Sequence, residues 1–593
     1  MKLLEYPFDA GDILRRKRKI RRELLEKGEP FLEKKVAVLG GSTTKEIINI
    51  LELFLLNYGI KPQFYESEYN QYYEEAVFPN SKLAAFEPDI IYLCTTNRNI
   101  MAYPAITDTP DAVKDLLRAE QEKFEGIWKN LNMRYHCPII QNNFEMPLWR
   151  LLGNRDASDI HGAVNFITRL NLQFYEYAQT HDDFYICDLN YISADYGLKE
   201  WLDPLYYYLY KYALNVEAIP YLAFNVANII KSIFGKNKKG FVLDLDQTLW
   251  GGIIGEDGAE AIKIGPEDPE GEAFYEFQKY IKVHKQLGIV LTVDSKNDPK
   301  NAVAGLSHPD SELSCEDFAV IKANWEPKDR NLAEIASALN LLPESLVFID
   351  DNPVERHLVS NQIPGVAVPE IGESHQYIQN IDRNGYFEVT TLSEDDYQRT
   401  EMYQKNAERA RMRESFAEYG DYLRSLEMKA TIRPFELFYL ERIAQLTNKS
   451  NQFNLTTRRY TKQELKQILE DPDYITLYGK LRDRFGDNGV VSVVIGHKTG
   501  TSCCIDLWLM SCRVLKRDME LAMMDALVHK CQREGITHLY GDYYPTEKNN
   551  MVRDFYALRE FEKVSEDEYG NTKWVFEIKD SYEEKNRYIR MEE

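Results

Sequence analysis

The sequence lacks any apolar run long enough to cross a membrane as a helix. A membrane helix needs roughly 18 or more consecutive apolar residues, and no stretch of the chain approaches that length. The first residues, MKLLEYPFDAGDILRRKRKIRRELLEK, also lack the apolar core of a secretory signal. We therefore expect a cytoplasmic protein without a membrane span.

Cysteine is scarce and scattered. The chain has eight cysteines in 593 residues, and none of them form a C-x-x-C pair. This usage provides neither a disulfide framework nor a zinc site. We expect the cysteines to be reduced residues of the core.

Positive charge is in deficit. The chain has 72 lysines and arginines against 95 aspartates and glutamates, which gives a formal net charge of -23. Such a charge repels phosphate backbones, so we expect no nucleic-acid partner. A small acidic substrate must then be met by local positive charge or by a metal ion.

The length predicts several domains, because about 100–200 residues per domain are usual. In the first part, strand-like runs such as KKVAVLGG and DIIYLCTT alternate with the helical pattern TTKEIINILELFLLNYG. The polar, glycine-ended stretch KNKKG marks a first boundary. We predict an α/β multidomain chain with an α/β domain at 1–235, a second α/β domain at 236–386, a helical linker at 387–429 and an α+β domain at 430–593.

The third and fourth of these segments rest on a change of pattern. From Ser393 to Lys429 the charges are dense and alternate in sign, with almost no helix breakers, which predicts solvent-exposed helices. The strands VVSVVIGHK, CCIDLWLM and THLYGDYY and the helical pattern RDMELAMMDALVHKCQREG follow.

Polar residues follow successive strand-like runs in the second domain. Asp244 and Asp246 end FVLDLD, Ser295 ends IVLTVDS, and Asp350 and Asp351 end SLVFIDD. Lys328, in ANWEPKD, lies between the last two clusters. Because the carboxyl ends of parallel strands meet at one edge of a sheet, we expect these side chains to share one site.

The chemistry of this set is that of phosphoryl transfer. Carboxylates and waters suit a magnesium ion, and a free carboxylate can attack phosphorus. A second carboxylate can protonate the leaving oxygen, while a lysine and a hydroxyl hold the phosphoryl oxygens. A DxDxT sequence alone is equally typical of a capped turn, so the ordered set of motifs carries this interpretation.

DLDQT, Ser295, Lys328 and FIDD together resemble the four motifs of the haloacid dehalogenase (HAD) superfamily. The resemblance implies a Rossmann-like parallel sheet, and short intervals between the motifs leave no room for a large cap. It also implies that Asp244 is the phosphoryl-accepting nucleophile. Asp246 is then the general acid and base, and a magnesium ligand through its backbone.

The remaining motif residues receive roles by the same resemblance. Ser295 and Lys328 bind phosphate, and Thr248 supports that site. Asp350, with Asp351, binds Mg²⁺ beside Asp244. An acid at position 246 implies phosphatase or phosphotransferase chemistry.

A longer set of motifs, DLDQTLWGGIIGEDG, DSKND, NWEPK, IDDNP and NKSNQFNLTTRRY, resembles the FkbH-like proteins of this superfamily. That family delivers a glyceryl group from bisphosphoglycerate to an acyl carrier protein as a thioester. The family has a cysteine before the serine of the second motif, where this chain has Asp294. A carboxylate cannot hold a thioester, so phosphate removal is the expected activity.

The first domain resembles the SGNH hydrolases. VAVLGGST places Ser42 at a strand-to-helix turn, and Asn97 in LCTTNRN matches that family's asparagine. The expected Asp-x-x-His block is represented by Asp203 with Tyr206 in place of histidine. Without this base we expect the domain to bind or cover substrate, with His161 as a structural residue.

The last domain resembles the GNAT acyltransferases. Their coenzyme A pyrophosphate lies at a helix start, which corresponds to Arg513 and Lys516 in RVLKRD, with Asp518 at a position where small residues are usual. Tyr556 stands where a general acid would stand, and the neighbouring glycine is replaced by Glu560. Acetyl-CoA or acyl-CoA is therefore a candidate cofactor. The alternative is that the domain recognises a carrier protein through NQFNLTTRRY and its two arginines.

Three functions follow from these patterns. The preferred one is a Mg²⁺-dependent phosphatase acting on a phosphorylated small acid or a carrier-tethered acyl group in a biosynthetic pathway. The second is a glyceryl transferase that loads an acyl carrier protein. The third is a scaffold whose flanking domains are not catalytic.

Overall fold

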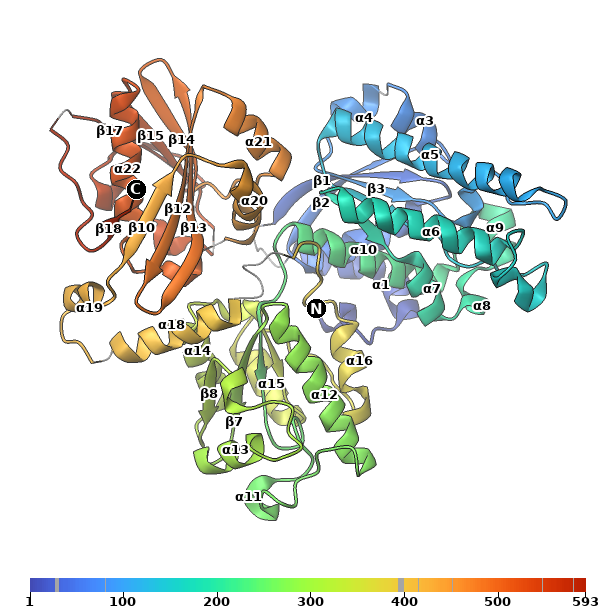
Figure 1. Cartoon of the computed structure of the whole chain (residues 1–593), viewed down its shortest axis with the longest axis horizontal. Helices are drawn as coiled ribbons and strands as arrows, with labels where there is room; N and C mark the ends of the chain where they lie inside the picture. The colour runs from blue at the N-terminus through green and yellow to red at the C-terminus, as the bar shows by residue number, and fades with distance from the viewer. Residues whose placement is uncertain are drawn as a thin grey trace. The chain divides into compact units, whose positions relative to one another are not determined.

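Parallel sheets form the centre of two parts of the chain, and a mostly antiparallel sheet forms the centre of a third (Figure 1). The computed structural model describes residues 1–26, 31–79, 81–392, 399–413, 415–450, 452–546, 548–579 and 581–592. The chain divides into two units, Met1–Ile233 and Phe234–Glu593. The predicted α/β class is confirmed. Among the described residues, no helix is long and apolar enough to span a membrane.

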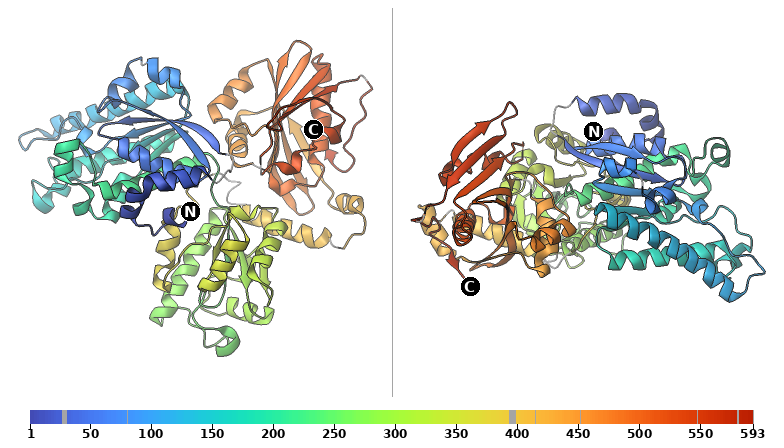
Figure 2. Two further views of the ribbon diagram at one scale, coloured as in Figure 1. Left: turned by 180° about the vertical axis from the view of Figure 1, so that it is seen from behind. Right: turned by 90° about the horizontal axis from the view of Figure 1, so that it is seen from above.

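The first unit contains a five-stranded parallel sheet in the order β2-β1-β3-β4-β5. Helices cover both faces (Figure 2), and α5 and α6 supply Phe124, Trp128 and Phe166 to the core on one of them. Its strands are β1 (Leu32–Gly40), β2 (Ile60–Glu66), β3 (Ile90–Cys94), β4 (Ile139–Asn142) and β5 (Phe184–Cys187). Its α-helices are α1 (Ala10–Leu25), α2 (Lys45–Asn57), α3 (Tyr72–Val77), α4 (Ser81–Phe86), α5 (Pro110–Tyr135), α6 (Ala163–Thr180), α7 (Leu189–Tyr196), α8 (Leu198–Trp201), α9 (Pro204–Tyr210) and α10 (Ile219–Ile233).

The order of these strands reverses at one point. The chain passes from β1 to β2 on one side and then returns to place β3 on the other side of β1. The carboxyl ends of β1 and β3 therefore flank a crevice of the kind in which α/β sheets bind ligands. Ser42 follows β1 and Asn97 follows β3.

The second unit begins with a four-stranded parallel sheet in the order β8-β7-β6-β9. The segment between β6 and β7 holds only two helices, so no large cap is inserted there. The strands are β6 (Gly240–Leu243), β7 (Val290–Ser295), β8 (Val320–Ala323) and β9 (Leu346–Ile349). The α-helices are α11 (Ile254–Asp257), α12 (Pro269–Gln286), α13 (Pro299–Leu306), α14 (Lys328–Ala338), α15 (Pro353–Gln362) and α16 (Tyr377–Asp382).

A mixed sheet with the path β16-β17-β15-β14-β13-β12-β10-β18 completes this unit. The pairs β14/β15 and β10/β18 are parallel and the other pairs on the path are antiparallel, which confirms the predicted α+β character. The strands on this path are β10 (Lys429–Arg433), β12 (Tyr474–Asp483), β13 (Gly486–Thr499), β14 (Ser502–Met510), β15 (His538–Tyr543), β16 (Glu562–Glu566), β17 (Thr572–Glu577) and β18 (Arg590–Met591). The α-helices beside them are α20 (Leu440–Lys449), α21 (Lys462–Glu470) and α22 (Met519–Arg533).

The charged segment before this sheet forms α18 (Arg399–Arg413) and α19 (Tyr419–Ser425), while residues 393–398 lie outside the described part of the chain. The expectation that these helices are wholly solvent-exposed is wrong, because α18 buries Met402, Tyr403 and Arg409. Arg409 can be buried because its guanidinium donates to both carboxylate oxygens of Asp483, at 2.8 and 2.9 Å. From the sequence pattern alone an arginine is expected to be exposed, because the pattern does not reveal a partner that lies far along the chain.

Candidate active site

The carboxyl edge of the four-stranded sheet brings together the acidic motifs and the lysine. Asp244 follows β6, Asp350 and Asp351 follow β9, and Lys328 is the first residue of α14. The Lys328 Nζ lies 2.9 Å from Asp244 Oδ2 and also contacts Asp350 Oδ2. Motifs separated by more than a hundred residues therefore meet at one point, as the strand-end argument predicted.

Three of these carboxylates form a donor set for a cation. Asp244, Asp350 and Asp351 each offer an oxygen, and these oxygens lie within 4.8 Å of one another. Oxygen-only donors with this spacing fit Mg²⁺, which prefers carboxylates and retains several waters. The side chain of Asp246 is not in this set. Its predicted role as a metal ligand concerned the backbone carbonyl and stays a prediction.

Burial and mutual repulsion perturb the charges here. Burial raises the pKa of Asp350, and the neighbouring Asp244 raises it further. Burial also raises the pKa of Asp351. For Lys328, burial lowers the pKa, but the carboxylates of Asp244 and Asp350 outweigh this and raise it, so the lysine stays charged.

Asp246 is held by three donors at the site's edge. Its Oδ1 accepts hydrogen bonds from Trp250 Nε1 at 2.8 Å and from the backbone N–H of Ile254 at 3.1 Å. Its Oδ2 accepts from Asn297 Nδ2 at 2.9 Å. Burial nevertheless raises the pKa of this carboxyl group, which favours the protonated form that a general acid needs.

The predicted phosphate-binding hydroxyls lie at the same edge. Thr248 is fully buried, and its Oγ1 accepts a hydrogen bond from the backbone N–H of Asp351 at 3.2 Å. This bond ties the turn after β6 to the turn after β9, in keeping with a supporting role. Ser295 is the buried last residue of β7. Its contact with phosphate stays a prediction.

Asp294 occupies the position of the family's cysteine and is fully buried. Its Oδ1 accepts from Asn331 Nδ2 at 3.0 Å, and its Oδ2 has no hydrogen-bond partner among the described residues. Burial raises the pKa of this carboxyl group to about 8, although the charge of Lys328 acts in the opposite direction. The side chain is therefore a largely neutral acid at pH 7, and it offers no thiol.

This raised pKa predicts a pH-dependent stability that Asp294→Asn removes. The folded carboxyl group keeps its proton up to about pH 8, whereas the unfolded one releases it near pH 3.9. Wild type therefore loses free energy of unfolding as pH rises between those values, since the folded state binds the extra proton. Asparagine preserves the acceptor for Asn331. In thermal melts from pH 5 to pH 8, the melting temperature of the variant should rise relative to that of wild type as pH increases. A constant difference between the two melting temperatures would contradict the raised pKa of Asp294.

Several residues of the site were not predicted from the sequence. Asn297 and Trp250 orient Asp246, and Asn331 holds Asp294 while pairing with Asn324 through bonds of 2.8 and 3.1 Å. Trp250 lies inside the motif DLDQTLWGG and Asn297 inside DSKND, so both could have been singled out from the sequence. Asn331 stands three residues after Lys328, one helical turn along α14, which was a usable signal.

Ser42 and Asn97 follow the two neighbouring strands at which the strand order of the first unit reverses. Ser42 is buried, and its hydroxyl has no hydrogen-bond partner among the described residues. Asn97 donates from Nδ2 to the backbone oxygen of Glu145 at 3.3 Å. Glu145 was not predicted, and burial raises the pKa of its carboxyl group to about 7. A catalytic role for Ser42 stays without support, because its hydroxyl is bonded to no base among the residues that the structure describes.

The residues considered as that base have other partners. Asp203 caps α9 by accepting from the backbone N–H groups of Leu205 and Tyr206, at 2.8 and 3.3 Å. The two ring nitrogens of His161 lie 2.8 Å from Asp159 Oδ1 and 3.0 Å from the backbone oxygen of Asp108. This geometry fits the structural role expected of His161.

Comparisons with known proteins agree with this architecture. Residues 35–231 match the family model described as FkbH, N-terminal domain. The N-terminal part of the protein BF1531 from Bacteroides fragilis, a crystal structure containing a phosphatase domain complexed with Mg, is 29% identical; the match covers 63% of this chain and 99% of that chain, with a TM-score of 0.59. The chain is therefore similar to FkbH-like proteins in its first unit, and over a larger part to a phosphatase-domain protein that binds Mg. No curated protein matches this chain.

Other solved structures also match this chain, but weakly. Ard1 from Thermoplasma volcanium is 17% identical over 26% of this chain and 99% of that chain, with a TM-score of 0.21. A GNAT-family acetyltransferase from Streptococcus pneumoniae is 14% identical over 26% of this chain and 100% of that chain, with a TM-score of 0.22. TM-scores this low support no inference about the activity of this chain.

The predicted cofactor residues of the last domain have internal partners. Arg513 is buried, with Nε donating to Ser511 Oγ at 3.2 Å and Nη1 against Met402. Lys516 is exposed, and its backbone oxygen accepts from the hydroxyl of Tyr419. Arg513 is therefore not available to a pyrophosphate in this arrangement.

The start of α22 is acidic. Asp518 is its N-cap residue and Glu520 lies in its first turn, and burial raises the pKa of both carboxyl groups. The guanidinium of Arg559 balances the charge of the Glu520 carboxylate, with Nη2 3.1 Å from Oε1. Carboxylates at a helix start disfavour a second anion there, so coenzyme A binding stays an unsupported prediction.

Tyr556 is buried and packs on a glycine. A Cβ atom at Gly541 would lie 2.3 Å from the Tyr556 ring, so only glycine fits beneath it. The Tyr556 hydroxyl is 3.4 Å from the backbone oxygen of Asp542, and burial raises its pKa well above the usual value. These features are those of a core residue and do not favour a general acid.

The described residues of NQFNLTTRRY, the segment expected to meet a carrier protein, are largely internal. It contains β11 (Phe453–Asn454), which pairs with β14, and the backbone N–H of Leu455 donates to the oxygen of Trp508 at 3.1 Å. Arg459 donates to the backbone oxygens of Thr447 and Ser450. Arg458 is exposed and paired with Asp506, whereas Arg459 is half-buried.

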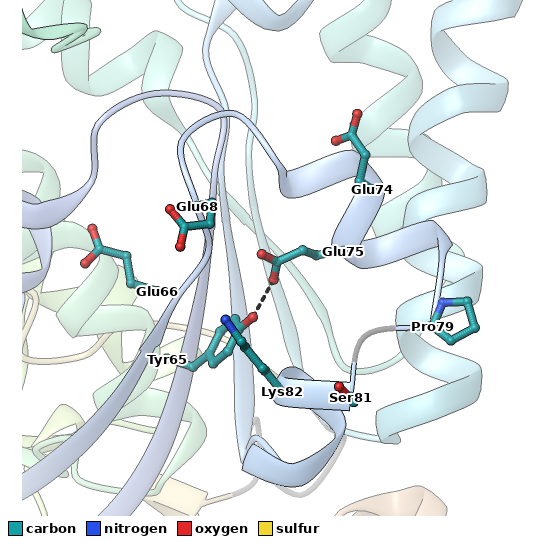
Figure 3. Close-up of a pocket in the computed structure, with 8 residues that line it drawn as sticks. All are labelled: Tyr65, Glu66, Glu68, Glu74, Glu75, Pro79, Ser81 and Lys82. Carbon is teal, nitrogen blue, oxygen red and sulfur yellow. Dashed lines mark hydrogen bonds between the residues drawn. The ribbon is translucent and has the colours of Figure 1, made fainter.

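A cavity of about 390 Å³ lies in the first unit (Figure 3). Its lining includes Glu66, Glu68, Glu74 and Glu75 against a single lysine, Lys82. The hydroxyl of Tyr65 donates to Glu75 at 2.8 Å. This acidic lining repels phosphate groups, so a phosphorylated substrate is not expected to bind there.

Proposed function

We propose that this protein is a Mg²⁺-dependent phosphatase in which Asp244 is the nucleophile. Its substrate is a phosphorylated small acid or a phosphorylated acyl group tethered to a carrier. The observation that carries the proposal is the convergence of three carboxylates and Lys328 at one sheet edge, with Asp246 held beside them. The Mg complex of the Bacteroides fragilis phosphatase domain supports the same metal here.

The chain's own residues account for each step. A carboxylate oxygen of Asp244 forms a bond to phosphorus while the bond to the leaving oxygen breaks, and Asp246 gives that oxygen a proton. Water then attacks the aspartyl phosphate, Asp246 takes up its proton, and phosphate leaves. Lys328 holds charge that develops on the phosphoryl oxygens. Asp244, Asp350 and Asp351 would hold Mg²⁺, which offsets the negative charge of the phosphate when bound.

The glyceryl transferase alternative needs a thiol beside the phosphate site. Asp294 is the residue at that position, and its carboxyl group is fully buried against Asn331. A carboxyl group cannot hold a thioester. The geometry therefore favours hydrolysis over transfer to an acyl carrier protein, which stays a proposed partner only as the bearer of a phosphorylated acyl group.

Chelation should remove the activity and Mg²⁺ should restore it. We expect phosphate release from a panel of monoesters and acyl phosphates to fall at least about 100-fold with EDTA, because three neighbouring carboxylates then repel the substrate. Phosphate release is measured before chelation, after it, and after addition of Mg²⁺. Circular dichroism of the chelated protein verifies that the fold is retained. Full activity in EDTA would contradict the proposal.

A further inference from the structure

Large apolar side chains are exposed around the edge that carries the candidate site. Ile253, Trp325 and Val354 are 43%, 71% and 71% exposed. Trp325 precedes Lys328 by three residues, and Val354 follows Asp351 by three. They come from the segments after β6, β8 and β9. Isolated exposed apolar residues are ordinary, but here two loops and the start of α15 supply one each close to residues of the site.

The orientation of Trp325 is fixed relative to Asp246. Its indole Nε1 donates to Asp298 Oδ1 at 3.3 Å. The backbone N–H of Asp298 donates to Asn297 Oδ1 at 2.9 Å, and Asn297 Nδ2 donates to Asp246 Oδ2 at 2.9 Å. A continuous series of hydrogen bonds therefore joins the exposed indole to the proposed general acid. Ile253 is tied to the same group, since the next residue in the chain donates to Asp246 Oδ1.

This connection determines which part of a substrate Trp325 meets. The phosphoryl group lies at Asp244 and Lys328, and the leaving oxygen must reach Asp246 to receive its proton. Trp325 is joined to Asp246 by the hydrogen bonds above, so an organic part that leaves Asp246 on that side meets the indole. Three side chains are too few for a protein interface, which buries roughly 800 Å² per partner. They are enough to cover a small organic group, because an indole alone presents about 150–250 Å².

We propose that Trp325, with Ile253 and Val354, binds an apolar segment of the leaving group. The enzyme then prefers phosphate esters whose organic part is apolar close to the phosphate oxygen. This inference rests on the proposed function, because it places the leaving group by the role of Asp246. Trp325 is a specificity residue that contacts substrate beyond the reacting atoms.

Two alkyl esters with leaving groups of similar basicity test the idea. With n-hexyl phosphate, Trp325→Ala should raise KM about tenfold, because the hexyl chain loses its apolar contact. With glycerol 3-phosphate, KM should change less than about twofold, and kcat should be nearly constant for both esters. Trp149→Ala, which removes an indole of 73% exposure from the other unit, should change neither. Equal effects of Trp325→Ala on both esters would overturn the inference.

A binding measurement separates this inference from the proposed function. Calorimetric titration of Asp244→Asn with each ester, in Mg²⁺, needs no turnover. We expect hexyl phosphate to bind more tightly than glycerol 3-phosphate, and Trp325→Ala in the same background to remove the difference. Equal affinity for both esters, or no binding of either, would refute the inference. If wild type hydrolyses no ester while this preference persists, the phosphatase proposal fails and the apolar subsite stands.

Discussion

Asp244→Asn should lower phosphate release by at least about 10⁴-fold while the fold stays intact. The amide that replaces the carboxylate cannot attack phosphorus, and removing the nucleophile of a covalent mechanism typically costs this much or more. The substitution keeps the shape of the side chain and an oxygen that can accept from Lys328, now 2.9 Å from Asp244. We therefore expect kcat to decrease while the melting temperature stays nearly unchanged.

The measurement is phosphate release with saturating Mg²⁺, on whichever ester the wild type turns over fastest. Asp310→Asn makes the same chemical change at an exposed aspartate of the same sheet domain and should leave the rate within about twofold. If Asp244→Asn kept more than about a tenth of the wild-type rate, another group would have to be the nucleophile. The whole assignment of the motif residues would then be wrong.

The predicted site residues that the structure brings together share one physical property. Asp244, Asp350 and Asp351 each follow a short buried strand, and parallel strands deliver their carboxyl ends to one edge. Lys328 does not follow a strand directly, yet it opens a helix at the same edge. Polar residues at strand ends are conspicuous in a sequence because the strand before them is apolar. Fold class and this part of the site could therefore be predicted together.

Residues that act through distant contacts could not be predicted in this way. Asn297 is an ordinary amide in the sequence, and only the fold brings it to Asp246, 51 positions earlier. Arg409 is one charge among many in its helix, and its burial depends on Asp483, 74 positions later. The spacing of polar and apolar residues predicts which face of a helix or strand is buried. It does not predict a hydrogen bond to a distant segment, because that bond depends on where the segment lies in the fold. Such partners need the tertiary structure.

In the flanking domains the sequence suggests functional residues that the structure does not support. Their residue types match a family motif, but their surroundings differ from those that the chemistry requires. Ser42 lies at the predicted turn, but Asp203 caps a helix and does not orient a base. Arg513 and Tyr556 occupy the positions that a family pattern suggests, and both side chains are buried. A motif predicts where a residue lies in the fold. Catalysis also requires that substrate can reach the side chain and that suitable groups lie next to it. In the central domain the partners are present, because Lys328 contacts the carboxylates of Asp244 and Asp350.

Lys328→Met should lower kcat/KM by at least about 10³-fold and also destabilise the protein. The lysine is 2% exposed and contacts the carboxylates of Asp244 and Asp350. Removing one partner of a buried ion pair leaves an uncompensated charge and costs about 3 kcal/mol or more. In catalysis, the substitution removes the cation that holds the phosphoryl oxygens, which alone is worth about 10²–10³-fold.

Magnesium distinguishes these two consequences of Lys328→Met. Without the lysine, three carboxylates within 4.8 Å repel one another, so a divalent cation should raise the melting temperature of the variant more than that of wild type. Activity should remain low in the same samples, because Mg²⁺ restores charge balance without restoring the donor. Lys322→Met, which removes a partly exposed lysine of β8 paired with Glu334 of α14, should change stability by less than about 1 kcal/mol. Melting curves and kcat/KM measured with and without Mg²⁺ decide the point. Wild-type activity in Lys328→Met would show that the lysine balances charge in the folded protein and takes no part in catalysis.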